Sequence, residues 1–157
     1  MLKKFLTDTN AGLIRLMDIG ASGKLDPKWQ KLTPLIDLTG FEPNIDECNR
    51  LSEEETNLCR KTYLPYALSG KTEERELNET SSIYCWSLLN PNTDWLNRFS
   101  YSDLFSVLNK SKIKTFALDD IAEIKNEDFD AVKMDTQGME LPILKGGKKI
   151  LSNVFYL

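Results

Sequence analysis

Short apolar runs separated by glycine and polar turns divide the chain into alternating elements. Residues 13–19 (LIRLMDI) form an apolar run that ends near Gly20, which predicts a buried strand followed by a turn. Residues 35–41 (LIDLTGF) predict a second strand, and Pro43 disfavours helix at the residue before it, so this strand ends there. Residues 25–35 lie between the two strands and predict a helix.

The rest of the chain continues this pattern. It predicts a surface helix, a strand, a hairpin arm, two strands and a final helix, at residues 45–59, 62–68, 71–78, 113–118, 129–134 and 139–150 respectively. Strands that alternate with helices indicate an α/β fold with a mainly parallel sheet and helices on both faces. The chain has 157 residues without an internal repeat, which predicts a single domain over residues 1–157.

Composition narrows the function classes. With 24 acidic and 20 basic residues the chain has no general attraction for nucleic acid or anionic membranes, and no apolar stretch is long enough to span a membrane. The amino terminus lacks the apolar core of a secretory signal. Cys48, Cys59 and Cys85 match no zinc spacing and the chain has no histidine, so we expect reduced thiols in a cytoplasmic protein, no zinc site and no histidine-based catalysis.

Acidic residues follow the predicted strands. Asp18, Glu42, Asp120 and Asp135 all stand at or just after an apolar run. Because ligands of parallel sheets bind beyond the carboxyl ends of the strands, these positions are the candidate site.

The turn after the first strand favours a nucleoside that carries a positive charge. Gly20 and Gly23 let the backbone approach a ligand closely, but Asp18 stands where a dinucleotide-binding fingerprint begins with glycine. A carboxylate there repels a pyrophosphate and tolerates a sulfonium, which favours S-adenosylmethionine. Glu42 suits the two ribose hydroxyls. The alternative is a tight turn with a helix cap at Ser22.

Six segments, in this order along the chain, resemble the FkbM family of S-adenosylmethionine-dependent methyltransferases. They are residues 18–23, 41–44, 67–70, 87–92, 115–121 and 133–140 followed by Leu144-Lys145-Gly146. The most specific segment is KMDTQGME at 133–140. The resemblance implies a Rossmann-like class I methyltransferase fold that binds the cofactor at the first three strand ends and methylates oxygen on a sugar or a similar small hydroxyl compound.

On this basis the site residues are assigned as follows. Cofactor-binding residues are expected at Asp18, Gly20, Ala21, Ser22, Gly23, Glu42, Pro43, Asn44, Ala67, Leu68 and Asp135. Asp18 faces the methionine end of the cofactor or orders the glycine turn, and Asn44 lies near adenine. Ala67 and Leu68 contact the base or simply pack at a strand end.

The catalytic expectation centres on Asp135, which accepts the proton of an alcohol acceptor. Lys133 pairs with Asp135 or Glu140 and sets their protonation, and Gln137 and Glu140 contact the acceptor or the amino-acid end of the cofactor. The alternative is a structural network of Lys133 with carboxylates that fixes the loop. Cys85, Trp86 and Trp95 line an acceptor pocket or take part in aromatic packing, and no metal is expected.

Two departures from the family pattern matter. The glycine motif has Ser22-Gly23 where the family pattern has Asn-x-Gly, a mild change that still permits cofactor contact. The chain ends at Leu157, inside the strand expected after the last helix, so the final strands of a seven-stranded class I sheet are expected to be missing. A truncated enzyme, a domain completed by dimerisation or a non-catalytic remnant that binds the cofactor weakly would each fit. A dinucleotide-dependent oxidoreductase is the third hypothesis, and Asp18 counts against it.

Overall fold

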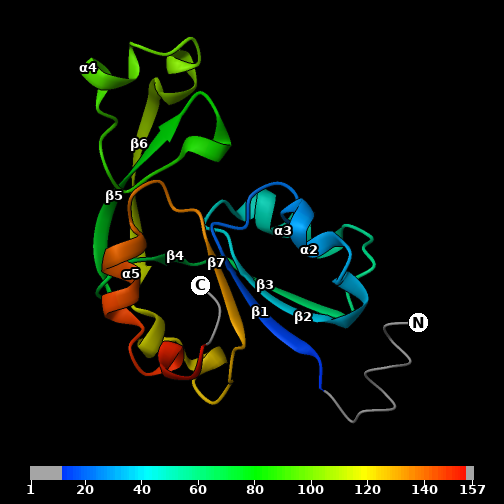
Figure 1. The fold of residues 1–157 in the computed structure, drawn as a ribbon. Helices are drawn as coiled ribbons and strands as arrows, with labels where there is room; N and C mark the ends of the chain where they lie inside the picture. Colours follow the sequence, from blue (N-terminus) through cyan, green and yellow to red (C-terminus); the bar gives the residue numbers. More distant parts are fainter. Residues whose placement is uncertain (1–11, 155–157) are drawn as a thin grey trace.

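The computed structural model describes residues 12–154, and its larger sheet is fully parallel (Figure 1). Its order is β3-β2-β1-β7, with β1 at Ile14–Ile19, β2 at Ile36–Phe41, β3 at Arg60–Leu64 and β7 at Ala131–Met134. The strands predicted from the first two apolar runs and from residues 129–134 are confirmed. All carboxyl ends of these strands lie at one edge of the sheet.

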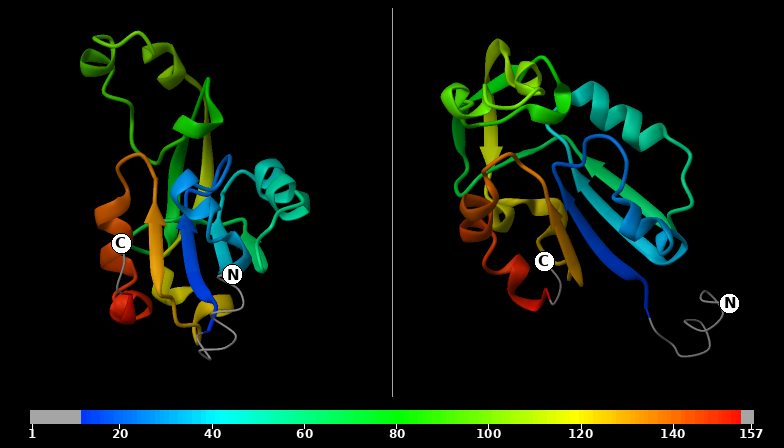
Figure 2. Two further views of the ribbon diagram at one scale, coloured as in Figure 1. Left: turned by 45° about the vertical axis from the view of Figure 1, so that its right-hand side comes forward. Right: turned by 45° about the horizontal axis from the view of Figure 1, so that its top comes forward.

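A second, smaller sheet has the order β4-β6-β5. Strand β4 (Ala67–Leu68) is parallel to β6 (Val107–Phe116), and β5 (Glu73–Thr80) is antiparallel to β6. The run at 62–68 predicts one strand, with Pro65 indicating a bulge or an edge. Pro65, which lacks a backbone N–H, instead separates two strands, β3 and β4, and β3 is an edge strand of the larger sheet. The predicted hairpin arm is confirmed as β5, and the long β5–β6 connection projects beyond both sheets (Figures 1 and 2).

Helices cover both faces of the larger sheet, as predicted. Helices α2 (Pro27–Gln30) and α3 (Ile45–Glu53) lie on one face, and α5 (Glu140–Gly146) lies on the other (Figure 2). Helix α4 (Thr93–Leu96) lies in the projecting connection. Among residues 12–154, short 3-10 turns occupy residues 33–35, 83–85, 102–105, 118–120, 122–124 and 150–153.

Three predicted helices are shorter in the structure. The surface helix predicted at 45–59 is α3, which ends at Glu53. The helix predicted at 25–35 is only α2 followed by a 3-10 turn, because Pro34 stands in the first turn of that second segment. The final helix ends at Gly146 instead of 150. A Cβ on Gly146 would lie 2.9 Å from the carbonyl oxygen of Ser69, so this end of α5 packs backbone against backbone on the segment after β4.

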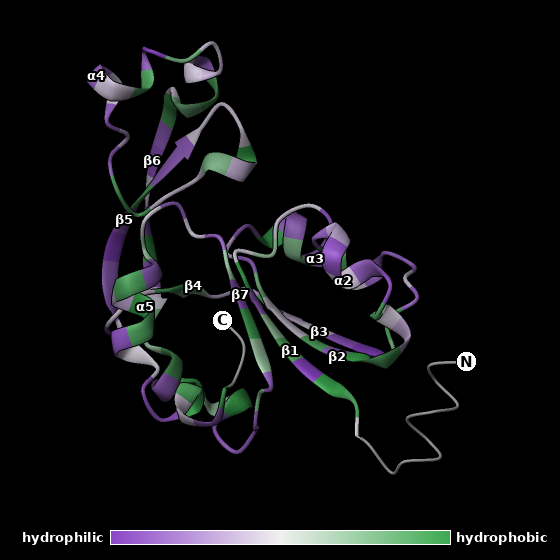
Figure 3. Ribbon diagram, viewed as in Figure 1, coloured by the Kyte–Doolittle hydropathy of each residue, from purple (hydrophilic) through white to green (hydrophobic). Residues whose placement is uncertain are grey.

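Each face of the larger sheet has its own apolar core. One cluster joins Met17, Phe41 and Val132 to Ile143 of α5, and the other joins Leu38 to Trp29 of α2. Figure 3 shows the hydrophilic colour along most of β5, consistent with its sequence EERELNET, and hydrophobic segments on α5. Within residues 12–154, no helix has the length and apolar character needed to cross a membrane.

Candidate functional site

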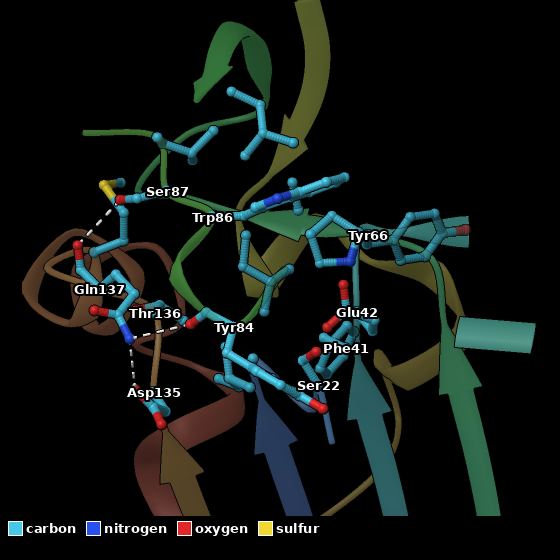
Figure 4. Close-up of a pocket in the computed structure, with 18 of the residues that line it drawn as sticks. Ser22, Phe41, Glu42, Tyr66, Tyr84, Trp86, Ser87, Asp135, Thr136 and Gln137 are labelled. Carbon is cyan, nitrogen blue, oxygen red and sulfur yellow. Dashed lines mark hydrogen bonds between the residues drawn. The ribbon is translucent and has the colours of Figure 1, made fainter. Parts of the chain in front are cut away.

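A pocket opens at the carboxyl edge of the larger sheet (Figure 4). One wall is made by residues after β1, β2 and β7, and by β4. The opposite wall is the segment 83–88, here called the strap, which follows β5. The space between these walls, including the part open to solvent, is about 740 Å³.

The glycine turn after β1 is held against both neighbouring strands. The backbone N–H groups of Gly20 and Ala21 both donate to the carbonyl of Phe41, at 3.1 Å each. Gly20 has φ of 74°, and a Cβ there would lie 2.0 Å from the carbonyl oxygen of Asp135. Only glycine fits this conformation and this space, so the turn needs Gly20 irrespective of any ligand.

Helix α3 fixes the far end of the same turn. Glu47 Oε1 accepts a hydrogen bond from the backbone N–H of Gly23 at 2.8 Å, and Arg50 Nη2 donates to the Gly23 carbonyl at 3.3 Å. Arg50 also binds Glu47, with Nε 2.6 Å from Oε2, and this pairing lowers the pKa of the Glu47 carboxyl. The sequence reasoning missed this clamp, although a Glu–Arg pair three residues apart in a predicted helix was visible.

Asp18 pairs with Lys133, which corrects the expected partner of that lysine. The two residues are register partners on β1 and β7, and Lys133 Nζ lies 2.9 Å from Asp18 Oδ1 and donates to the Gly20 carbonyl at 2.7 Å. Pairing of Lys133 with Asp135 or Glu140 is thus wrong, since neighbouring parallel strands bring Asp18 closer. Burial raises the pKa of Asp18, and the charge of Lys133 opposes that rise. Of the two expected roles of Asp18, ordering the turn fits these contacts.

Glu42 is a buried carboxyl in the pocket wall. Only 5% of its surface is exposed, and its Oε1 accepts a hydrogen bond from the backbone N–H of Asn44 at 2.8 Å. Burial raises the pKa of Glu42 to about 7. The side chain of Asn44 caps α3 by accepting from the N–H groups of Asp46 and Glu47, so its oxygen is engaged away from the expected adenine contact.

The hydroxyl of Ser22 is a buried polar atom at the pocket. Its Oγ has no hydrogen-bond partner among residues 12–154, and Ser22 and Glu42 both line the cavity (Figure 4). A buried hydroxyl without a partner costs free energy, about 1–3 kcal/mol. A polar ligand in the pocket would supply that partner.

The loop after β7 joins the two walls. Gln137 has φ of 54°, unusual for a residue other than glycine, and its Nε2 donates to Asp135 Oδ1 and to the Tyr84 carbonyl, both at 3.4 Å. Ser87 Oγ donates to the Gln137 carbonyl at 3.1 Å. Asp135 is an exposed residue that lines the pocket. The hydrogen bonds of Gln137 with Tyr84 and Ser87 connect its loop to the strap.

Glu140 organises this loop from within. Its Oε1 accepts from the N–H and Oγ1 of Thr136, at 3.0 Å each, and from the N–H of Gly138 at 3.3 Å. Although burial opposes them, these hydrogen bonds hold the pKa of Glu140 below its ordinary value. Glu140 therefore fits the expected structural network of Lys133 with carboxylates that fixes the loop. Lys133 itself is not part of that network, because it pairs with Asp18.

The structure brings half of the expected residues to the pocket. Gly20, Ser22, Glu42, Pro43, Ala67, Leu68, Asp135 and Gln137 line it. Asp18, Ala21, Gly23, Asn44, Asp120, Lys133 and Glu140 do not. Of the aromatic residues near 86, Trp86 lines the pocket, whereas Trp95 packs on Phe99 in the projecting connection, with ring centroids 4.7 Å apart.

The comparison with family models decides the family. A model described as the methyltransferase FkbM domain matches residues 21–156, most of the chain. The chain belongs to the FkbM methyltransferase family. The segment that the FkbM model matches includes Glu42, Asp135 and the strap. Neither the curated proteins nor the solved structures contain a match.

Membership confirms the resemblance based on the six motifs and the Rossmann-like α/β class. A methyltransferase needs a methyl donor, so the FkbM domain has to accommodate one. Within the part of the chain that the structure describes, no three His, Cys, Asp or Glu side chains are grouped to hold a metal ion.

Proposed function

We propose that this domain transfers a methyl group from S-adenosylmethionine to a hydroxyl of a small molecule. The observation that carries the proposal is the combination of one buried carboxylate, Glu42, with a pocket wall without basic residues. Among the described residues that line the pocket, none is Lys or Arg. Such a pocket offers no counter-charge for the phosphates of a dinucleotide, whereas an adenosine with a sulfonium needs none.

The donor side of the pocket has the groups that a nucleoside needs. Glu42 at the end of β2 can accept hydrogen bonds from both ribose hydroxyls, and the buried hydroxyl of Ser22 adds a second polar contact beside it. Pro43, Ala67 and Leu68 supply apolar surface for the base. When bound, the cofactor supplies a methyl group already activated by the positive sulfur, so positioning is the main task of the protein.

The acceptor side lies between the loop after β7 and the strap. Asp135 is the exposed carboxylate at this end and accepts the proton of the attacking hydroxyl. The amide of Gln137 donates to Asp135 Oδ1 at 3.4 Å and restrains the carboxylate. We assign the apolar and aromatic strap residues to the wall against which the acceptor packs.

Isothermal titration calorimetry with S-adenosylhomocysteine tests the proposal. We expect saturable binding to the unaltered chain and a loss of about 1–3 kcal/mol for Glu42→Ala, the worth of hydrogen bonds to a charged group. The exposed Glu55, in the turn after α3, provides the matched control Glu55→Ala with unchanged affinity. Absence of binding, or tighter binding of NADH than of S-adenosylhomocysteine, would overturn the proposal.

A further inference from the structure

Tyr84 places a large, mostly exposed ring directly on the glycine turn. Its relative exposure is 59%, yet it lines the pocket. A Cβ on Gly23 would lie 3.0 Å from Tyr84 Cε1, and two further ring atoms would be within 3.8 Å. The ring therefore covers the backbone of Gly23, and Figure 4 shows it reaching from the strap across the end of β1 toward Ser22.

Hydrogen bonds hold the strap that carries this ring on both of its sides. Asn78 and Ser87 exchange two backbone hydrogen bonds, at 2.8 and 3.2 Å, which fix the strap to β5. Gln137 donates to the Tyr84 carbonyl and accepts from Ser87 Oγ, which fixes the strap to the loop after β7. These hydrogen bonds fix the main chain of the strap on both sides of Tyr84, so the position of Tyr84 is set by its main chain. Within residues 12–154 its hydroxyl makes no hydrogen bond.

We propose that Tyr84 is a cofactor-contacting residue whose ring forms the outer wall of the donor site. This inference rests on the proposed function, because it needs a nucleoside held by Glu42 and the glycine turn. A ligand in that position would lie in contact with the Tyr84 ring, since the ring and the turn both line the same cavity. The ring would lose water-exposed surface on binding and would shield the polar contacts at Glu42 from solvent.

Three variants separate a wall made by the ring from other roles. Calorimetry with S-adenosylhomocysteine should show about three- to tenfold weaker binding for Tyr84→Ala, the range of one aromatic contact. Tyr84→Phe should bind within twofold of the unaltered chain, because the hydroxyl takes no part. Tyr101→Ala is the matched control, since Tyr101 is 47% exposed and stacks on Phe99 away from the pocket. It should leave the affinity unchanged.

A second measurement does not depend on how well the alanine variant folds. In protein labelled with 3-fluorotyrosine, addition of S-adenosylhomocysteine should shift the ¹⁹F resonance of Tyr84, assigned through Tyr84→Phe, and leave that of Tyr101 in place. Unchanged affinity of Tyr84→Ala, equal losses in the Phe and Ala variants, or an unmoved Tyr84 resonance at saturation would each overturn the inference while the proposed function stands. Failure of the unaltered chain to bind would overturn the proposed function itself.

Discussion

Replacing Glu42 by Gln removes a titratable carboxyl from the pocket wall and keeps its shape. The amide oxygen of Gln can still accept from the N–H of Asn44, the bond that Glu42 Oε1 accepts at 2.8 Å. Burial raises the pKa of Glu42 to about 7, from an ordinary value of 4.5. The hydrogen bond from Asn44 and the charge of Lys133 oppose this rise in pKa, and the charges of Glu47 and Asp18 contribute to it.

The sign of the pH effect follows from this direction. Between pH 4.5 and 7 the folded chain keeps a proton on Glu42 that the unfolded chain releases, so the free energy of unfolding falls as the pH rises. The loss is complete above pH 7. A pKa rise of this size corresponds to a loss of about 3 kcal/mol in the free energy of unfolding. About 2–3 kcal/mol of that loss occurs between pH 5 and 8. The Glu42→Gln variant has no titrating carboxyl at this position, so its free energy of unfolding does not show this loss.

Urea unfolding followed by tryptophan fluorescence measures the difference. We expect Glu42→Gln to gain about 2–3 kcal/mol over the unaltered chain as the pH rises from 5 to 8. Other titrating groups cancel in the comparison because both proteins carry them. A stability difference that stays constant over this pH range would refute the reasoning that burial governs Glu42.

The same titration extends to the ligand. If ribose hydroxyls donate to the Glu42 carboxylate, S-adenosylhomocysteine binds the ionised form and should bind about tenfold more weakly at pH 6 than at pH 8. The affinity of Glu42→Gln should be weaker but flat over this range. Calorimetry in buffers with different ionisation enthalpies would show the proton released on binding. An equal pH dependence in both proteins would assign the effect to another group.

Two further substitutions test the frame of the site. Gly20→Ala should destabilise the fold by about 2 kcal/mol or more, because the new Cβ would meet the Asp135 carbonyl, while Gly12→Ala, in open space, should be neutral in thermal unfolding. Lys133→Met leaves the buried Asp18 without its cation and should cost about 3–5 kcal/mol at pH 8, and a change below 1 kcal/mol in urea unfolding would contradict the pairing.

The site residues at the strand ends could be predicted from the sequence, because a run of apolar residues indicates a buried strand. The runs before Asp18, Glu42 and Asp135 became parallel neighbours, and their ends met at one edge as expected. The glycine turn followed from its residue types, since backbone that passes within contact distance of a neighbouring strand excludes a Cβ. These are local or periodic signals that a single chain carries.

The strap and the partner of Lys133 depend on contacts that no local pattern records. Tyr84 reaches the glycine turn 61 positions earlier only because a second sheet redirects the chain after β4. Lys133 pairs with Asp18 and not with Asp135 because of the strand register, which cannot be read from the spacing along the sequence. Asn44 was expected beside adenine, yet its short polar side chain serves the helix start, a role that its position before Ile45 also allowed.

The backbone contact between α5 and the segment after β4 leaves no room for a side chain. Gly146 rests against the main chain of Ser69 and Gly70, so a Cβ at this position would push the helix and this segment apart. Ala67 and Leu68 of β4, directly before that segment, line the pocket. A larger residue at position 146 should therefore disturb the pocket wall through the main chain.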